Sequence, residues 1–539
     1  MVEHVSFHGL TPQSFLDRSA FVYPDKPAVI YKDRTYTYAQ FQDRVIKLAG
    51  ALRQAGVQKG DRVAFLLPNL PEMLEGHYGP MRIGAILVPI NIRLSGREIA
   101  QILNHSGAKV LVFDSEMAQT VRDFKDDVPG VETFVQVVDT SPREDDIPGP
   151  DYESFLVSAP VGDHREESGS EMDTIAINYT SGTTGMPKGV QYTYRGAYLN
   201  ALGQAMETGM NWQSMYLWTL PMFHCNGWCF TWGVTAVAGT HVCLRRVEPA
   251  EVFRLVPLEG ITHMCCAPTV LISLYSAPEA VGRALSGVII LTAGAPPAPQ
   301  VIRQVEGLGA YLHHGYGLTE TYGPHTICAI QPGWDDLPLE ERARLKARQG
   351  VSYILTEPGL RIVDEHMNDV PRDAETMGEV VMRGNNVMSG YFNDPEATAT
   401  AFQGGWFHSG DLAVWHADGY IELQDRAKDI IISGGENISS QQVEKTIMEH
   451  PAVLEVCVVG VPDERWGEVP KAFVTARSGV EITEEEIVGF TRERIAHFKC
   501  PKYVQFGELP KTATGKIQKF ILREQEWRGH ERRIQGSTG

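Results

Sequence analysis

The sequence predicts an α/β protein built from more than one domain. Its 539 residues exceed what a single hydrophobic core usually serves. Short apolar segments with the character of buried strands alternate with segments of helical periodicity through residues 1–330, as in α/β folds. The hydrophobic content of 43% and the charged content of 21% are ordinary for a soluble globular protein.

The individual elements follow from these patterns in chain order. Runs of apolar and β-branched residues predict strands at 63–67, 110–113, 174–177, 215–220, 288–292 and 378–384. A helix is expected at 194–206 and a polar, proline-rich surface loop at 142–151. A smaller unit of strands and helices begins at Asp425 and ends near Lys516, and the charged tail at 523–539 is expected to fray.

Charge and cysteine usage exclude several classes of function. The net charge of −19 argues against nonspecific binding to nucleic acid or to anionic membrane, although local lysines and arginines can still bind an anionic substrate. The eight cysteines lack the spacing of a disulfide framework, which predicts buried free thiols in a reducing compartment. Around His224, Cys225 and Cys229 no second ligand pair follows at a finger-like spacing, so no metal cluster is predicted.

The sequence shows no recognisable targeting signal, which predicts a cytoplasmic location. The chain opens without a charged and then apolar leader, and no apolar run reaches the length of a membrane span. The terminal Gly-Ser-Thr-Gly is not a peroxisomal address. We therefore expect a cytoplasmic protein without a membrane span.

The most informative stretch is 179–189, which reads Tyr-Thr-Ser-Gly-Thr-Thr-Gly-Met-Pro-Lys-Gly. Its glycines let successive backbone N–H groups point at one anion, its hydroxyls add short donors, and Lys188 adds a charge. With a strand before it and a helix after it, the run predicts a phosphate site of the strand–turn–helix kind. It is not a Walker A loop, because Pro187 and Gly189 break that pattern, and a flexible surface loop is the alternative.

This run resembles the phosphate loop of the adenylate-forming superfamily, which comprises acyl-CoA synthetases, luciferases and peptide-synthetase adenylation domains. Other motifs of the superfamily follow in order, so that the resemblance covers nearly the whole chain. At 314–321 the chain reads His-Gly-Tyr-Gly-Leu-Thr-Glu-Thr. The resemblance implies that Tyr316 contacts adenine, Thr319 the α-phosphate and Glu320 Mg²⁺, a cation that prefers oxygen ligands. Without it, a turn with a helix cap at Thr319 would be the simpler interpretation.

Further motifs add a ribose site, a hinge and a catalytic lysine. Residues 406–411 resemble the ribose-binding motif, where Asp411 accepts the diol, and 425–429 resemble the hinge between a large and a small domain. There Arg426 matches a ribose- or phosphate-contacting arginine and Lys428 the position whose backbone rotates. Lys516 matches the lysine that holds the carboxylate substrate and the α-phosphate, where negative charge builds up during attack.

The acyl site is expected around 221–228, which reads Pro-Met-Phe-His-Cys-Asn-Gly-Trp. His224 matches an aromatic position that shields the phosphates and gates the thiol, although a histidine in an apolar run is often a core residue. Trp228 is expected on a strand at the floor of the pocket, where it would favour short acids. Trp232 fits core packing as well as it fits the pocket. This segment resembles methylmercaptopropionate-CoA ligases and neighbouring short- to medium-chain ligases.

Taken together, the resemblance implies a large N-terminal domain at 1–424, made of αβ-layered subdomains and a β-barrel-like part. A hinge at 425–430 and a small mobile α+β domain at 431–539 follow. The implied function is an ATP-dependent acyl-CoA ligase for a short or medium acid, best 3-methylmercaptopropionate, which forms acyl-AMP and then the CoA thioester, with Mg²⁺ as cofactor. The alternatives are a medium-chain or aromatic acid ligase, a carrier-protein-loading enzyme, luciferase-like oxidation, and a catalytically silent acyl-adenylate sensor. A homodimer is common in the superfamily.

The resemblance assigns residues to four roles. The catalytic residues are Lys516, His224 and Lys428. The residues for nucleotide and coenzyme A are Thr180, Ser181, Gly182, Thr183, Thr184, Gly185, Lys188, Gly294, Ala295, Pro296, His314, Gly315, Tyr316, Gly317, Thr319, Asp411, Arg426, Gly434, Gly435 and Glu436. The acyl group is assigned to Trp228, Gly294, Tyr322 and Gly323, and the metal to Glu320 and Thr180.

Overall fold

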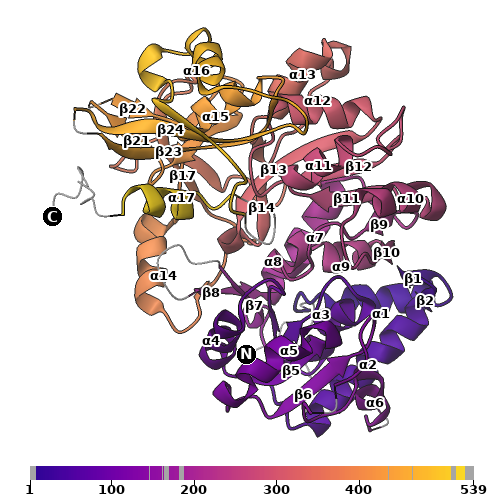
Figure 1. Ribbon diagram of the computed structural model, residues 1–539. Coiled ribbons are helices and arrows are strands. Elements are labelled where there is room, and N and C mark those ends of the chain that lie inside the picture. The colour runs from indigo at the N-terminus through magenta and orange to yellow at the C-terminus, as the bar shows by residue number, and fades with distance from the viewer. Residues whose placement is uncertain are drawn as a thin grey trace.

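The computed structural model (Figure 1) describes residues 8–144, 146–160, 162, 169–180, 187–434, 436–463, 465–511 and 517–528. Two large sheets, a small antiparallel sheet and a separate C-terminal sheet make up this part of the chain. The mixed α/β architecture with a smaller C-terminal unit is the predicted fold class. None of the helices in these ranges has the length and apolarity that a bilayer crossing requires.

The first large sheet carries the predicted phosphate run at its edge. Its strand order is β18-β8-β7-β4-β3-β5-β6, and the strands from β7 to β6 run parallel while β8 and β18 run antiparallel to their neighbours. The bounds are β3 Arg62–Leu66, β4 Ile86–Pro89, β5 Ala108–Asp114, β6 Thr133–Val137, β7 Thr174–Tyr179, β8 Gly189–Thr193 and β18 Gly390–Tyr391.

The second large sheet has the order β15-β14-β13-β12-β11-β9-β10-β1-β2 and is parallel from β13 to β1. The bounds are β1 Pro27–Tyr31, β2 Arg34–Thr37, β9 Met215–Leu217, β10 Thr240–Val242, β11 His263–Cys266, β12 Ile289–Thr292, β13 Tyr311–Leu318, β14 Gly323–Ile327 and β15 Val351–Ser352. Buried parallel strands are continuously apolar, which is why the sequence predicted the strands at β9 and β12 within a few residues.

Helices cover both large sheets. They are α1 Gln13–Val22, α2 Tyr38–Gln54, α3 Pro71–Arg82, α4 Gly96–Ser106, α5 Ala118–Phe124, α6 Tyr152–Val157, α7 Tyr194–Glu207, α8 Cys225–Trp228, α9 Phe230–Ala236, α10 Pro249–Glu259, α11 Pro268–Tyr275, α12 Pro299–Gly307 and α13 Leu339–Lys346. Every residue of α3 is buried, because this helix lies inside the largest hydrophobic core. That core joins side chains from Phe15 to Leu423, so the two sheets fold as one body around it.

The remaining elements follow after residue 352. The small sheet consists of β16 Leu360–Val363, β17 Met377–Met382, β19 Phe407–Trp415 and β20 Ile421–Arg426, all antiparallel, with α14 Pro395–Ala401 beside it. The C-terminal unit contains β21 Ile431–Ser433, β22 Glu436–Ile438, β23 Val453–Asp463, β24 Gly467–Ala476, β25 Tyr503–Phe506, α15 Ser440–Met448, α16 Glu484–Arg492 and α17 Lys519–Glu526. The short 3₁₀ turns are η1 Ser115–Met117, η2 Lys125–Asp127, η3 Thr319–Thr321, η4 Trp334–Asp336, η5 Gln403–Gly405 and η6 His497–Lys499.

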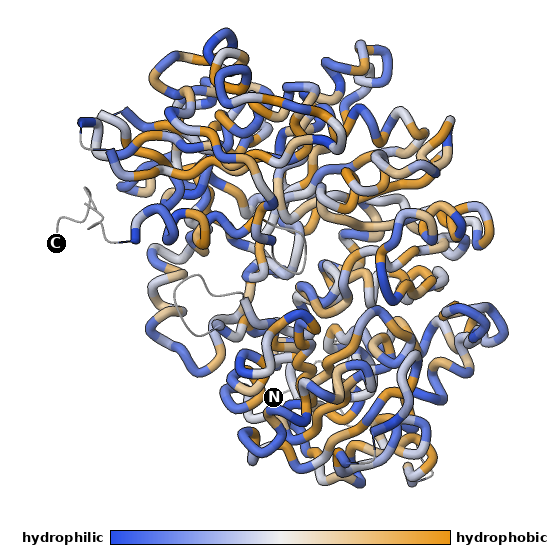
Figure 2. Tube along the Cα trace, viewed as in Figure 1, coloured by the Kyte–Doolittle hydropathy of each residue, from blue (hydrophilic) through white to orange (hydrophobic). Residues whose placement is uncertain are grey.

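Figure 2 shows hydrophobic positions along the strands of each sheet and mostly hydrophilic residues in the peripheral turns. The C-terminal unit has its own core, with α15 packed on β23. One prediction about this unit is wrong in part. Residues 519–526 form α17 and are held by ion pairs of Lys519 and Arg523, so the start of the predicted frayed tail is ordered.

Candidate active site

The glycine-rich run connects the antiparallel strands β7 and β8. The backbone N–H of Thr180 donates to the Lys188 carbonyl at 3.0 Å, and the Lys188 N–H donates to the Thr180 hydroxyl at 3.3 Å. The predicted strand–turn–helix order is therefore wrong. The residues after the run pair with β7 as β8, and α7 begins only at Tyr194, capped by Thr193. Ser181, Gly182, Thr183, Thr184 and Gly185 lie outside the described residues, as do Gly435 and Lys516.

Glu320 and Lys188 meet at a residue that the sequence analysis missed, Tyr391. The Tyr391 hydroxyl donates to Glu320 Oε1 at 2.9 Å, and the Lys188 Nζ lies 4.7 Å from the centroid of the Tyr391 ring. Burial and the Glu320 carboxylate raise the pKa of Tyr391, so this phenol stays protonated and donates. Because β18 pairs with β8, a tyrosine about 200 positions downstream stands beside the phosphate run. No local pattern around Tyr391 signals this.

The predicted ribose site brings three separate motifs together. The Tyr316 hydroxyl donates to Asp411 Oδ2 at 2.8 Å, and Arg426 Nε lies 3.0 Å from Asp411 Oδ1. Asp411 and Arg426 are also cross-strand partners in β19 and β20. The Asp411 carboxylate is the main cause that raises the pKa of Arg426. Residues from three motifs thus share one buried carboxylate.

The ends of β12 and β13 lie next to this cluster. The sheet register pairs Thr292 with His314, so Gly294, Ala295 and Pro296 follow β12 where His314 and Gly315 begin the predicted adenine motif. Burial lowers the pKa of His314 to about 4, which keeps its ring neutral. Only glycine fits at position 317, because an added Cβ would lie 2.0 Å from the Gly323 carbonyl oxygen. Ligands of open α/β sheets bind at such carboxyl ends of strands.

The segment predicted as a strand at Trp228 is a left-handed turn. Cys225, Asn226, Gly227, Trp228 and Cys229 have φ values of 44°, 45°, 58°, 50° and 65°. Left-handed backbone costs roughly 1–2 kcal/mol for each residue with a Cβ, and such strain gathers at functional sites. An added Cβ at Gly227 would lie 2.6 Å from the Trp218 ring, so a glycine fits here for both reasons.

This turn faces the predicted nucleotide motif. Cys225 Sγ lies 3.6 Å from the Thr319 hydroxyl oxygen, and burial raises the pKa of the Cys225 thiol to about 12. His224, which caps the turn, stands directly before these residues. Asn226 was missed by the sequence analysis. It is completely buried, and both polar atoms of its side chain have no hydrogen-bond partner among the described residues.

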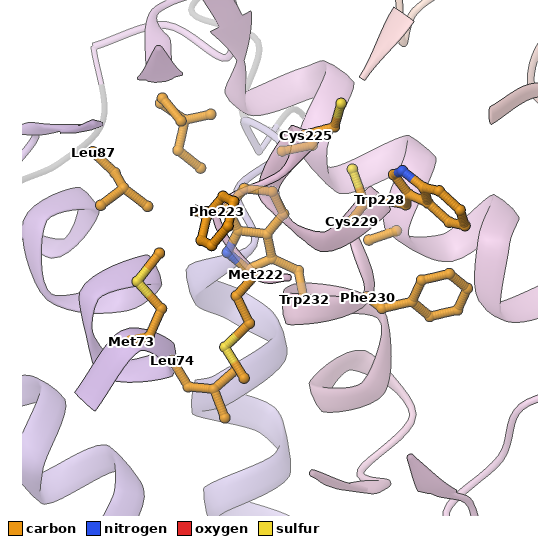
Figure 3. Close-up of a cluster of buried hydrophobic side chains, with 14 of the residues drawn as sticks. Met73, Leu74, Leu87, Met222, Phe223, Cys225, Trp228, Cys229, Phe230 and Trp232 are labelled. Atoms are coloured by element: carbon orange, nitrogen blue, oxygen red, sulfur yellow. The ribbon is translucent and has the colours of Figure 1, made fainter. Parts of the chain in front are cut away.

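The residues predicted for the acyl group are neighbours. An added Cβ at Gly323 would lie 3.0 Å from Trp228 Cβ, so the tryptophan packs directly on this glycine. The Tyr322 ring stacks on Tyr192 with a centroid distance of 3.6 Å. The Asn200 amide donates to the Tyr322 carbonyl at 3.0 Å and so holds the backbone in place. In Figure 3, Trp228 and Phe230 point away from the group formed by Met222, Phe223 and Trp232.

The predicted hinge is tied to the last helix of the described chain. Arg523 of α17 donates to the Lys428 carbonyl at 2.7 Å and lies 2.5 Å from an Asp429 carboxylate oxygen. Burial, and next to it Arg426, lowers the pKa of Lys428. Farther along, Gly434 donates its N–H to the Trp466 carbonyl at 2.8 Å, and Glu436 begins β22 beside it. Lys511 and Ile517 form an antiparallel bridge on either side of the segment that contains Lys516.

The chain matches two family models. The model described as AMP-binding enzyme matches residues 16–392, and the AMP-binding enzyme C-terminal domain matches residues 442–516. The 4-hydroxybutyrate–CoA ligase 2 of Metallosphaera sedula is 46% identical over 521 residues, which cover 96% of this chain and 94% of the relative. The peroxisomal acetate/butyrate–CoA ligase of Arabidopsis thaliana is 44% identical over 546 residues, with 96% and 95% covered.

A solved structure shares the whole fold. The crystal structure of ATP-bound MatB from Rhodopseudomonas palustris superposes with a TM-score of 0.82 at 26% identity and covers 96% of this chain and 99% of that one. Two family models, close relatives over nearly full length and a shared fold agree with the motifs. The chain therefore belongs to the AMP-binding enzyme family and is an adenylate-forming acyl-CoA synthetase.

Proposed function

We propose that the protein converts a short or medium carboxylic acid, ATP and coenzyme A into the acyl-CoA thioester, AMP and pyrophosphate. The observation that carries the proposal is that Tyr316 and Arg426 both contact the buried carboxylate of Asp411. The names of the two relatives reported above, both CoA ligases for short acids, support the same reaction.

In the first step the acid's carboxylate attacks the α-phosphate and pyrophosphate leaves. Asp411 accepts the ribose hydroxyls, Tyr316 borders the adenine, and Thr319 and Lys188 bind phosphate oxygens. Glu320 and Thr180 supply the hard oxygen ligands that suit Mg²⁺, and the Tyr391 hydroxyl orients the Glu320 carboxylate for this role. Mg²⁺ bound there neutralises phosphate charge. Lys516 holds the attacking carboxylate and the α-phosphate, a role that rests on the sequence resemblance.

In the second step the small domain, residues 431–539, rotates about the hinge at 425–430 relative to the large domain at 1–424. Lys428 is the pivot, and the sequence resemblance assigns Gly434, Gly435 and Glu436 to the coenzyme A arm. His224, at the start of the strained turn, gates the approach of the thiol to acyl-AMP. Domain rotation that assembles a site in stages is a common strategy in enzymes.

The acid is the finer part of the proposal. The sequence resemblance puts 3-methylmercaptopropionate first, and the names of the relatives add acetate, butyrate and 4-hydroxybutyrate as candidates. Trp228, packed against Gly323, occupies space that a long acyl tail would need. The proposal also includes a cytoplasmic location, which is in keeping with the eight buried free thiols. It further includes a homodimer.

The test is incubation of the purified protein with ATP, Mg²⁺, coenzyme A and a panel of acids, scored for AMP and for thioester. Equal amounts of AMP and thioester from short acids are expected, in a reaction that stops when coenzyme A is omitted. AMP formation with transfer only to a carrier protein would overturn the coenzyme A assignment. Binding of acyl-AMP without turnover of any acid would overturn catalysis itself.

A further inference from the structure

Three buried polar side chains meet around Trp232 of α9. The Trp232 ring contacts the Tyr322 ring edge-on at a centroid distance of 5.8 Å and the His77 ring of α3 at 5.6 Å. The exposed fractions of Trp232, Tyr322 and His77 are 0%, 1% and 1%. Trp232 Nε1, the Tyr322 hydroxyl and His77 Nε2 each lack a hydrogen-bond partner within the described ranges. We call this set the Trp232 cluster.

The chemistry of the three atoms is complementary. The Nδ1 of His77 lies 2.7 Å from the Met73 carbonyl oxygen, so Nδ1 carries the proton and Nε2 is left as an acceptor. The Trp232 indole N–H can only donate, and the Tyr322 hydroxyl can do both. Burial lowers the pKa of His77 to about 4, so this ring is neutral at physiological pH. Burying a polar group without a hydrogen-bond partner is costly, so three such groups on neighbouring rings are unusual in a packed core.

The Trp232 cluster adjoins the predicted acyl site. Tyr322 directly follows η3, which carries Thr319 and Glu320, and directly precedes Gly323, on which Trp228 packs. Figure 3 shows Trp232 among apolar side chains, with Phe223 and Met222 beside it and Met73 and Leu74 of α3 facing it. Trp232 therefore stands among apolar side chains, and its ring contact with Tyr322 connects it to the residues predicted for the acyl group.

We propose that the Trp232 cluster is the far end of the acyl site and selects acids that carry a hydroxyl group distant from the carboxylate. This inference rests on the proposed ligase function, and within it a distant hydroxyl group takes the place of the 3-methylmercaptopropionate thioether as the preferred feature of the acid. A hydroxyl accepts from the Trp232 N–H and at the same time donates to His77 Nε2, with Tyr322 as a further partner. An alkyl tail would leave all three atoms unpaired. A thioether or a second carboxylate can accept a hydrogen bond but has no proton for His77 Nε2.

The test compares 4-hydroxybutyrate with pentanoate, two acids of the same heavy-atom count that differ in a terminal hydroxyl and methyl group. A site built to bind a hydroxyl rejects the analogue without it, because the polar groups of the site are then left unpaired. We expect kcat/KM of the wild-type enzyme to favour the hydroxy acid by at least about tenfold. Tyr322→Phe, which removes one oxygen atom, and His77→Leu should each lower this ratio several-fold.

Tyr311→Phe is the matched control, because Tyr311 is 57% exposed on β13, and its ratio should equal that of the wild type. If His77→Leu unfolds, as judged by its melting curve, Tyr322→Phe alone decides. Equal or better use of pentanoate by the wild type overturns the proposal. So does a hydroxy-acid preference that both cluster variants retain, since the cluster would then hold only water. Absence of thioester from every acid of the panel would instead overturn the proposed function.

Discussion

Asp411 shows how one residue can connect distant motifs. Its two carboxylate oxygens contact Tyr316 and Arg426, so a nucleotide ribose that binds here must share or replace these contacts. Asp411→Asn keeps the size but loses the charge and part of the acceptor capacity. We expect the KM for ATP to rise roughly tenfold, the loss of about one charged hydrogen bond, while the KM for the acid changes little. Steady-state kinetics with each substrate varied checks this, and an unchanged KM for ATP would remove Asp411 from the ribose site.

Glu320 and Tyr391 are expected to contribute unequally to the proposed metal site. Glu320→Gln removes a negatively charged oxygen ligand and should slow adenylation by about 10²–10³-fold while raising the Mg²⁺ concentration needed for half activity. Tyr391→Phe removes only the 2.9 Å hydrogen bond that orients the carboxylate and should cost about 3–10-fold. Pyrophosphate exchange at several Mg²⁺ concentrations measures both. A larger defect in Tyr391→Phe than in Glu320→Gln would contradict the orienting role.

At the scale of elements, the strained turn at α8 determines where Trp228 stands. Trp228 has a φ of 50°, which glycine adopts without strain, so Trp228→Gly should relieve the backbone while it empties space beside Gly323. We expect transition-state binding to become stronger for longer acids and weaker, by about 1–3 kcal/mol, for short acids. The measurement is kcat/KM over a series of chain lengths. An identical profile in both proteins would show that Trp228 does not limit the acyl tail.

The contacts between the predicted hinge and α17 are a second feature at this scale. Arg523 joins α17 to Lys428 and Asp429, and it is mostly buried. Arg523→Gln should destabilise the domain orientation of this structure relative to the orientation that the proposed rotation produces. We therefore expect the two half-reactions to change by different factors, one slowing and the other nearly unaffected.

Each half-reaction can be followed alone, adenylation by pyrophosphate exchange and thioester formation from preformed acyl-AMP. Glu524→Gln is the matched control, because it changes a neighbouring charge on the same helix without touching the hinge contacts described for Arg523. This control should leave both half-reactions at the wild-type rate. Equal slowing of both half-reactions in Arg523→Gln would mean that Arg523 only supports the fold.

At the scale of the whole molecule, buried neutral histidines make stability depend on pH. Burial lowers the pKa of His77, His314 and His325 to about 4 and that of His241 to about 3. Unfolded histidine titrates near 6.5, so between that value and the folded pKa the unfolded chain binds more protons. The stability from these histidines is complete above about pH 6.5 and is lost as the pH falls, by about 1.4 kcal/mol per histidine and pH unit.

We accordingly expect the urea midpoint to fall steeply from pH 7 to pH 5. His241 is the clearest contributor, because its Nδ1 accepts the indole N–H of Trp218 at 3.1 Å and must stay unprotonated to do so. His241→Gln should flatten the pH slope by about one proton. His366→Gln, with a side chain that is 76% exposed, is the control and should keep the wild-type slope. A midpoint that does not vary over this range would contradict the neutral histidines.

The sequence predicted those features whose chemistry is local. The motifs predicted for adenine, for ribose and for the hinge were recognisable because each proposed role needs a few residues at fixed spacing. Structure then brought Tyr316, Asp411 and Arg426 within hydrogen-bonding distance of one another. Apolar strands such as β3, β5 and β12 were found within a few residues, since burial on both faces leaves a continuous hydrophobic run.

Tertiary structure alone decided the features that depend on distant neighbours. The strand β8 took the place of the expected direct step from turn to helix, and it pairs on one side with β7 and on the other with β18, about 200 residues downstream. The left-handed turn at Cys225–Trp228 exists only because its surroundings hold a strained backbone in place. The Tyr391–Glu320 hydrogen bond and the His77–Trp232 ring contact likewise form between elements that are far apart in the chain. The sequence by itself thus determined the reaction class, while the packed structure determined which side chains lie next to one another at the proposed acyl site.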